Sequence, residues 1–257
     1  MTFSLSGKKI LITGASRGLG SVCARAFAES EATLALLARS AEGLEAVRTS
    51  CARAAEHRAL PVDLTDAEAL EQTVHEATDF LGQIDVVLHV AGGGLGLREP
   101  LLSAADMGKL LSLNLMAAAE INRLVAPAMI ERGQGKLVHV GSIAGTEAVA
   151  SVGYNTAKAA LAAYVRSLGR ELAKSGIVVT GILPGGFHAP GNSWERLGAS
   201  KPEVVERFVD QRLPRGRLAK AEEVVSLLAF LCSDAASMMG GCMVPIDAGE
   251  GITYAAV

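Results

Sequence analysis

The stretch that decides the fold is Lys9-Ile10-Leu11-Ile12-Thr13-Gly14-Ala15-Ser16-Arg17-Gly18-Leu19-Gly20. A short apolar run, typical of a buried strand, passes directly into glycines at positions 14, 18 and 20, and an alanine-rich helical segment follows. Glycine permits a tight turn and a close approach of backbone N–H groups to a pyrophosphate, and a helix N-terminus favours an anion. This context predicts a dinucleotide-binding loop, with a purely structural turn as the alternative, although the spacing is Gly-x-x-x-Gly-x-Gly rather than Gly-x-Gly-x-x-Gly.

Beyond this loop, short apolar runs alternate with helical patterns along most of the chain. The predicted strands are Lys9–Thr13, Thr33–Ala38, Arg58–Val62, Val86–Val90, Lys136–Gly141, Val178–Leu183 and Met243–Ile246. The predicted helices are Leu19–Ser30, Ala41–Ala55, Asp66–Leu81, Ala104–Arg132, Tyr154–Lys174 and Ala221–Ser233. Several strands are nearly continuous in apolar residues, as expected when helices cover both faces of a parallel sheet. We therefore expect an α/β fold in which residues 1–257 form a single Rossmann-type, doubly wound domain of about seven parallel strands.

One segment departs from this alternation. Residues 184–220 hold three prolines after Pro184, several glycines, many charges and Trp194, the only tryptophan. A long irregular segment of this kind in an α/β domain is typical of a functional insert. We expect it to form a lid or specificity insert over the sheet.

Composition excludes several classes of protein. The net charge is −3 and no basic block occurs, which argues against a nucleic-acid surface. The apolar stretch Leu110–Ile130 is interrupted by polar and charged residues, so it predicts a buried or interface helix rather than a membrane span. The cysteines are scattered without a Cys-x-x-Cys pair, which predicts reduced thiols and no metal site. With no apolar signal core at the N-terminus, the cytoplasm is the expected location.

The ends of the second and third predicted strands bear on which dinucleotide binds. Leu36-Leu37-Ala38-Arg39-Ser40 has no acidic residue for a ribose 2′-hydroxyl, and it offers Arg39 instead, with Arg17 in the glycine loop. A guanidinium suits a 2′-phosphate, so NADP(H) is favoured over NAD(H), the alternative being that both arginines are merely solvated. Asp63, followed by Leu64, is placed either to accept a hydrogen bond from adenine or to cap the next helix.

Tyr154 and Lys158 stand four residues apart in a helical segment, so one turn places a phenol and an ammonium on the same face. A phenol with a pKa of about 10 is a poor proton donor at neutral pH, and a neighbouring cation lowers that pKa. The pair is therefore a candidate general acid/base, with a surface tyrosine beside a solvated lysine as the alternative.

Taken together, these motifs resemble the short-chain dehydrogenase/reductase family, particularly its 3-oxoacyl-carrier-protein reductase-like members, over nearly the whole chain. Residues 13–20 resemble the family's cofactor loop, and Asp63 sits at its adenine position. Pro184-Gly185 resembles the turn that closes on the nicotinamide, and Asp247-Ala248-Gly249 resembles the C-terminal Asp-Gly-Gly element. The residues that match the family's catalytic tetrad are Asn114, Ser142, Tyr154 and Lys158.

Two positions depart from the family pattern. Where members usually read Asn-Asn-Ala-Gly, this chain has His89-Val90-Ala91-Gly92, so Ala91 and Gly92 can line the ribose but an asparagine that braces the sheet is absent. Where a threonine often holds the carboxamide, this chain has Ala189, which leaves backbone or His188 to hold it. His89 and His139 lie in apolar strands and are expected to be satisfied core histidines.

The resemblance implies the reaction. A hydride passes between nicotinamide and a carbonyl or secondary alcohol, with Tyr154 as proton donor and Ser142 positioning the oxygen. Lys158 lowers the pKa of Tyr154 and binds ribose, and Asn114 holds a water of a proton relay. The segments that border substrate in the family carry polar residues, which indicate a polar or acidic small-molecule substrate rather than a sterol: Arg98, Glu147, His188, Asn192, Trp194 and Arg196.

Other readings stay open at this point. An NAD-dependent sugar or polyol dehydrogenase is the runner-up, and a non-catalytic dinucleotide sensor is a different class of protein. Trp194 is placed either to anchor the lid or to pack against a neighbouring subunit. The small apolar residues in the helices from Ala104 and Tyr154 suit close packing against another copy, with packing inside one subunit as the alternative. The family commonly forms tetramers through these two helices and the last strand, so a tetramer or dimer is expected.

Overall fold

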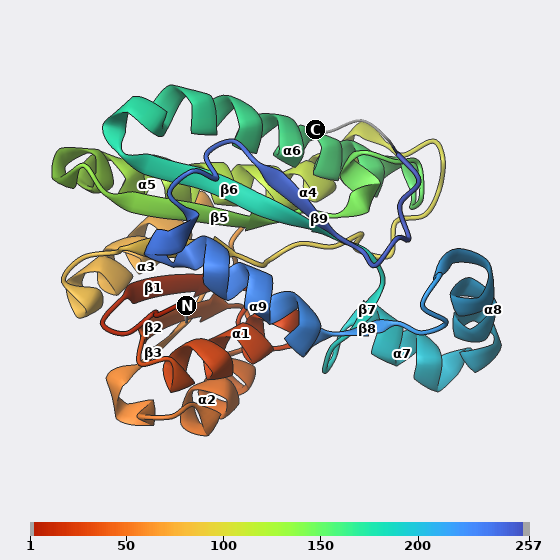
Figure 1. The fold of residues 1–257 in the computed structure, drawn as a ribbon, viewed down its shortest axis with the longest axis horizontal. Helices are drawn as coiled ribbons and strands as arrows, with labels where there is room; N and C mark the ends of the chain where they lie inside the picture. The colour runs from red at the N-terminus through yellow and green to blue at the C-terminus, as the bar shows by residue number, and fades with distance from the viewer. Residues whose placement is uncertain (1–2, 254–257) are drawn as a thin grey trace.

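The computed structural model describes residues 3–253 of the chain, and its centre is a parallel sheet (Figure 1). The seven strands run in the order β3-β2-β1-β4-β5-β6-β9, and every neighbouring pair is parallel. Their bounds are β1 Lys9–Thr13, β2 Thr33–Ala38, β3 Arg58–Pro61, β4 Val86–His89, β5 Gly135–Val140, β6 Ile177–Pro184 and β9 Met243–Ile246. The strand order reverses between β1 and β4, and ligands of such sheets bind at the carboxyl ends beside this point. The predicted fold class is confirmed.

Helices cover both faces of the sheet. One layer holds α1 (Gly18–Glu29), α2 (Ala41–Ser50) and α9 (Ala221–Cys232), and the other holds α3 (Ala67–Leu81), α4 (Ala104–Leu111), α5 (Ala117–Arg132) and α6 (Val152–Leu172). Alternate residues of a strand serve opposite faces. In β1, Ile10 and Ile12 join the core cluster of the first layer, whereas Leu11 joins that of the second.

The predicted continuous helix over Ala104–Arg132 is wrong at its centre. A π-helical turn at Ser112–Met116 separates α4 from α5, and the Ala117 N–H donates to the Ser112 carbonyl five residues earlier. The physical reason is a side chain that competes for the backbone ladder, because Asn114 Nδ2 donates to the Leu110 carbonyl at 2.9 Å. Single π turns of this kind occur often at functional sites.

The predicted helix over Ala41–Ala55 ends earlier, at Ser50. Cys51 is extended, and Arg53 has a positive φ of 55°, so the helix cannot continue through them. A short 3₁₀ turn, Ala54–Glu56, leads into β3.

After β6 ends at Pro184, residues 185–220 leave the sheet and form a separate projection at its carboxyl end (Figure 1). The projection holds β7 (Phe187–His188), α7 (Ser193–Ser200), α8 (Pro202–Arg212) and β8 (Ala219–Lys220), with β7 paired to β8. The two helices were not predicted from the sequence. Neither has a fully buried residue, and they are joined by Trp194 and Phe208, whose ring centroids lie 4.3 Å apart.

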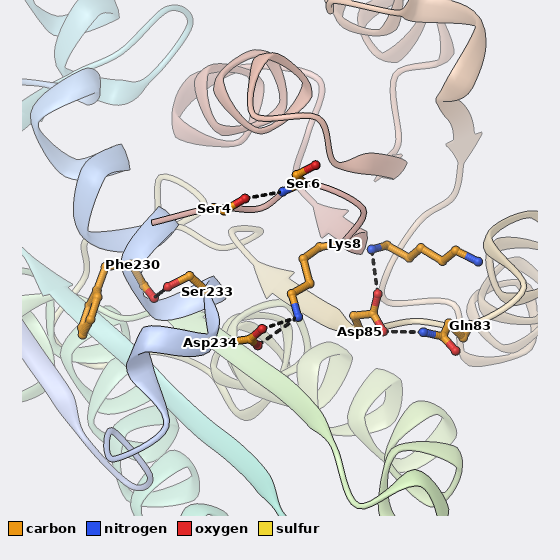
Figure 2. Close-up of polar contacts among 9 residues, drawn as sticks. Ser4, Ser6, Lys8, Gln83, Asp85, Phe230, Ser233 and Asp234 are labelled. Carbon is orange, nitrogen blue, oxygen red and sulfur yellow. Dashed lines mark hydrogen bonds and ion pairs between the residues drawn. The ribbon is translucent and has the colours of Figure 1, made fainter. Parts of the chain in front are cut away.

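Polar contacts tie the chain together at the amino ends of the strands (Figure 2). Lys8 Nζ lies 2.9 Å from both carboxylate oxygens of Asp234, which follows α9. Asp85 accepts the Lys9 N–H at 2.9 Å and the Gln83 side-chain amide at 2.7 Å, which fixes the start of β4 beside β1. These contacts lie at the edge opposite the carboxyl ends.

Within residues 3–253, no helix combines the length and the apolar character needed to cross a membrane. In the same range, no cluster of three or more His, Cys, Asp or Glu side chains is arranged to hold a metal ion. The cysteines are all free, three of them buried and Cys242 half-buried.

Candidate active site

Two glycines of the loop after β1 are required by close packing. Gly14 has a positive φ of 69°, and a Cβ there would lie 2.8 Å from the Ala91 backbone nitrogen. Gly20 packs against the backbone of Gly14, so a side chain there would overlap it. The lack of side chains at these two glycines thus lets the turn at the end of β1 pack against the segment that follows β4.

The same turn leaves backbone donors at the N-terminus of α1. Arg17 is the N-cap residue and its side chain caps nothing. The Gly18 N–H donates to the Pro190 carbonyl of the projecting segment at 2.6 Å. In the part of the chain that the structure describes, the N–H groups of Leu19 and Gly20 have no recorded acceptor outside the helix, as in a helix N-terminus suited to an anion.

Arg17 and Arg39 are exposed, and no hydrogen bond or ion pair of either side chain is recorded within residues 3–253. Arg39 is near enough to Asp63 to contribute to the lowered pKa of that carboxyl, after the hydrogen bonds from Thr65. The alternative that Asp63 caps the next helix is wrong. Asp66 is the N-cap of α3, and Asp63 accepts instead from the Thr65 N–H at 2.9 Å and its hydroxyl at 2.7 Å.

The structure brings Tyr154 and Lys158 together on α6. Lys158 Nζ lies 5.7 Å from the centre of the Tyr154 ring and donates to the Val140 carbonyl at the end of β5 at 2.9 Å. The lysine is 3% exposed, and burial lowers its pKa to about 8. Ser142, two residues after Val140, accepts the Ala144 N–H at 3.1 Å and begins a short 3₁₀ turn, Ile143–Gly145. These residues meet at the carboxyl end of β5.

The surroundings of Tyr154 act on its pKa in two opposing ways. Burial raises the pKa of Tyr154 above its usual value of 10.0, and a hydrogen bond with Ser142 opposes that rise. That Lys158 lowers the pKa of Tyr154 stays a prediction.

Asn114 is held by backbone groups. Its Oδ1 accepts the Gly93 N–H at 2.9 Å, and its Nδ2 donates to the Gly93 carbonyl at 3.0 Å. A Cβ on Gly92 would lie 2.7 Å from Asn114 Oδ1 and 3.1 Å from Lys158 Nζ, so the loop after β4 fits between these side chains only without one. Asn114 therefore joins the π turn to the loop that borders Lys158.

A polar network joins β4, α5, β5 and α6 next to the segment where the family usually has Asn-Asn-Ala-Gly. His89 Nε2 donates to Asn122 Oδ1 at 2.8 Å, and Asn122 Nδ2 lies 3.2 Å from His139 Nε2 and 3.1 Å from the Tyr164 hydroxyl. The two imidazoles stack with centroids 4.5 Å apart, and burial lowers the pKa of His89 to about 4. The prediction of satisfied core histidines is confirmed.

The bracing roles of Thr13 and Asn122 were not predicted from the sequence. Thr13 Oγ1 accepts the Val90 and Ala91 N–H groups at 3.2 and 3.3 Å, which braces the end of β4 from β1. The contacts of both residues join positions far apart in the sequence, so no local pattern predicts them. The one local indication of a role was a polar residue inside an apolar run.

The turn after β6 is held by the C-terminal segment. Gly185 N donates to the Ile246 carbonyl at 3.2 Å, and Gly186 N donates to Glu250 Oε2 at 2.5 Å. Asp247 accepts the N–H groups of Gly249 and Gly251. Glu250, a buried carboxylate, was not singled out from the sequence.

The polar residues expected at the substrate lie in different places. In the projection, His188 is exposed with Nε2 3.8 Å from Glu195 Oε1, Asn192 caps α7, and Arg196 donates to the Gly191 carbonyl. Arg98 is exposed, and Glu147 accepts the N–H groups of residues 252 and 253. A cavity of about 880 Å³ runs along Glu147, the end of α8 and the C-terminal segment.

Known proteins similar to this chain cover almost all of it. A family model described as "Enoyl-(Acyl carrier protein) reductase" matches residues 14–250. The chain is 32% identical to gluconate 5-dehydrogenase of Gluconobacter oxydans over 254 residues, 96% of each chain. It is 30% identical to 3-oxoacyl-[acyl-carrier-protein] reductase of Pseudomonas aeruginosa over 251 residues, 96% of this chain and 98% of the other.

Solved structures agree with the sequence relatives. L-sorbose reductase of Gluconobacter frateurii, complexed with NADPH and L-sorbose, superposes with a TM-score of 0.91 at 28% identity, covering 99% of this chain and 100% of that one. A 7α-hydroxysteroid dehydrogenase complexed with NADH and 7-oxo glycochenodeoxycholic acid gives 0.87 at 27% identity, covering 99% and 97%. The chain therefore belongs to the short-chain dehydrogenase/reductase family, whose members interconvert carbonyl and CH–OH groups with a nicotinamide dinucleotide.

Proposed function

We propose that this protein is an NADP(H)-dependent oxidoreductase that transfers a hydride between nicotinamide and a carbonyl or secondary alcohol, with Tyr154 as the general acid/base. The observation that carries the proposal is the meeting of Tyr154, Lys158 and Ser142 at the carboxyl end of β5, in the crevice where sheets of this topology bind dinucleotides.

The residues present fit the dinucleotide. The uncapped N-terminus of α1, with the Leu19 and Gly20 N–H groups, suits the pyrophosphate. Arg17 and Arg39 suit a 2′-phosphate, and Asp63 and Leu64 border the adenine. Ala91, Gly92 and Lys158 would hold the nicotinamide ribose, and Ser16, Pro184 and Gly185 would complete the crevice. The predicted dinucleotide site therefore runs from the glycine loop after β1 to the turn after β6.

The proton chemistry follows from the side chains. When bound, reduced nicotinamide supplies a hydride to the carbonyl carbon. Tyr154 donates its phenolic proton to the carbonyl oxygen as the C=O double bond becomes a C–O single bond, and Ser142 hydrogen-bonds that oxygen. Lys158, with a pKa of about 8, can return a proton to Tyr154 near neutral pH. Asn114 holds the loop at Gly93, and its water relay stays a prediction.

The proposal is tested by Tyr154→Phe, which removes the proton donor and keeps the ring. We expect turnover with a ketone panel to fall by about 10²–10⁴-fold, the usual contribution of a general acid/base. Dinucleotide binding, followed by the fluorescence of the reduced cofactor, should change little. Near-normal turnover in this variant would remove Tyr154 from the mechanism.

Cofactor preference is tested by Arg39→Asp. A charge-assisted hydrogen bond to a phosphate is worth about 1.5–3 kcal/mol, so we expect the parent protein to bind NADPH at least about 10-fold more tightly than NADH. The variant should lose or reverse this ratio. Tighter binding of NADH by the parent protein would favour the NAD-dependent alternative.

Three further expectations belong to the same proposal. Residues 184–220, with His188 and Trp194, act as a lid over the substrate, within a single domain spanning residues 1–257.

The protein forms a homodimer or homotetramer through α5 and α6, supported by the exposed apolar side chains of Met116 and Val152. It acts in the cytoplasm. Light scattering checks the assembly, since a strictly monomeric particle would contradict it.

A further inference from the structure

The cavity of about 880 Å³ beside the C-terminal segment has an unusual charged group in its wall. Glu250 lines it and is 6% exposed. One carboxylate oxygen, Oε2, accepts the Gly186 N–H at 2.5 Å. Within residues 3–253, the other oxygen has no recorded hydrogen bond. Since no buried side-chain nitrogen or oxygen in that range lacks a partner, this oxygen is open to solvent in the cavity and is free to accept a hydrogen bond from a bound molecule.

The charge of the cavity wall is negative. Glu147, Asp210 and Glu250 line it, and Arg212 is the one cation among the lining residues that the structure describes. Glu147 is occupied, because its carboxylate accepts the Ile252 N–H at 3.1 and 3.3 Å. Burial raises the pKa of Glu250, and the negative charges of Asp247 and Glu147 raise it further. The hydrogen bond from Gly186 and the positive charge of Arg212 lower it. A bound anion would be repelled by the same carboxylates.

The cavity adjoins the proposed reaction centre on two sides. Gly186, bonded to Glu250, follows Gly185 in the turn expected to close on the nicotinamide. Thr146 and Glu147, also in the wall, follow the short turn that Ser142 begins. Glu250 Oε2 also lies against Gly185, where an added Cβ would be 2.5 Å away, so a substrate held beside this turn would have its remaining groups near Glu250.

We propose that Glu250 binds the hydroxyl-bearing end of the substrate, and that the substrate is a neutral polyhydroxylated ketone or its alcohol; this rests on the function proposed above. Hydroxyl donors satisfy the free oxygen of Glu250, and the C–H faces of such a molecule pack against the cavity's apolar wall at Val149, Leu213 and Ile252. An anionic ketone is repelled, and an apolar ketone leaves the carboxylate without a donor.

The variant Glu250→Gln separates substrate binding from support of the turn. The Gly186 N–H requires an acceptor, so the amide oxygen takes the place of Oε2 and the NH₂ group takes the place of Oε1. The contact that holds the turn is kept, whereas the cavity exchanges a charged acceptor for a neutral NH₂ donor, which can make only an uncharged hydrogen bond to a substrate hydroxyl. Glu206→Gln, on the exposed face of α8, is the matched control for removing one negative charge from the projection.

Binding is measured by calorimetry with the full chain saturated with oxidised cofactor, so turnover is not needed. The probes are L-sorbose, a neutral ketose; 5-keto-gluconate, its carboxylate counterpart; and cyclohexanone, which has no hydroxyl. We expect L-sorbose to bind most tightly. Glu250→Gln should weaken it about 10-fold or more, the loss expected for a hydrogen bond to a charged acceptor, while leaving cyclohexanone within about twofold. The same variant should tighten 5-keto-gluconate, and Glu206→Gln should leave all three unchanged.

Three results would overturn the proposal. The first is that the parent protein binds 5-keto-gluconate or cyclohexanone more tightly than L-sorbose. The second is that Glu250→Gln leaves L-sorbose binding unaltered. The third is that the variant weakens the binding of all three probes equally, which would leave Glu250 a purely positioning role. Failure of the proposed redox function is seen separately, as turnover that survives Tyr154→Phe or as no dinucleotide binding at all. In the latter case, the same titrations on the protein alone still decide the role of Glu250.

Discussion

Replacing Lys158 with methionine should make the protein more stable at neutral pH while removing its activity. Lys158 is buried, and its pKa of about 8 lies below the 10.5 of a free lysine. Keeping it protonated in the folded state at pH 7 costs about 3 kcal/mol. Methionine fills the space without a charge. It also removes the hydrogen bond to the Val140 carbonyl, worth about 1 kcal/mol. The net gain in unfolding free energy at pH 7 is about 2 kcal/mol.

The pH dependence gives this prediction its sign. The unfolded chain binds the Lys158 proton more tightly than the folded chain, so the stability of the parent protein rises with pH between about 8 and 10.5 through this group. The methionine variant lacks that rise. The difference between the two proteins should therefore shrink from about 2 kcal/mol at pH 7 to near zero at pH 10.

The assay is urea unfolding followed by circular dichroism at both pH values, with equal m-values as the check on two-state behaviour. Lys174→Met, which removes an exposed lysine just beyond the end of α6, should change stability by no more than about 0.5 kcal/mol. The reasoning is refuted if Lys158→Met is less stable than the parent protein at pH 7, or if the difference between them is the same at both pH values.

Two further variants test the framework around the site. Gly14→Ala should lower the free energy of unfolding by about 1–3 kcal/mol, because the positive φ and the contact with Ala91 both disfavour a side chain. The control Gly198→Ala, which has open space around it in α7, should be neutral or stabilising. Thermal melts compare them, and equal effects would contradict the packing argument. Asn122→Leu should cost about 3 kcal/mol in urea unfolding, because it leaves His89 and other buried groups without partners; a loss below about 1 kcal/mol would show that the network relaxes freely.

The sheet could be predicted because its strands are local apolar runs between helices. Strands such as Thr33–Ala38 begin and end where the pattern indicated. The helices of the projection could not be predicted, because α7 and α8 have no fully buried residue and the prolines and charges of residues 184–220 are typical of loops. The meeting of Tyr154 and Lys158 was predictable from helical spacing alone.

What the sequence could not supply were effects of burial and distance along the chain. The raised pKa of Tyr154 and the lowered pKa of Lys158 both come from burial, which depends on the protein around them. The contact of Glu250 with Gly186 spans 64 residues, and that of His89 with Asn122 spans 33. No local pattern encodes such pairs.

The π turn at Ser112–Met116 places one surplus residue in an otherwise regular rod. Deleting any one residue of this turn would let α4 and α5 merge into an uninterrupted helix. The portion before the deletion would then rotate by about 100° about the axis relative to the portion after it. Asn114 and the loop at Gly93 would no longer face each other. The deletion would give a regular helix but would remove the Asn114 contact that holds the loop beside Lys158. When relatives are aligned, the number of residues in this turn therefore indicates whether the site is kept, as much as the residue types do.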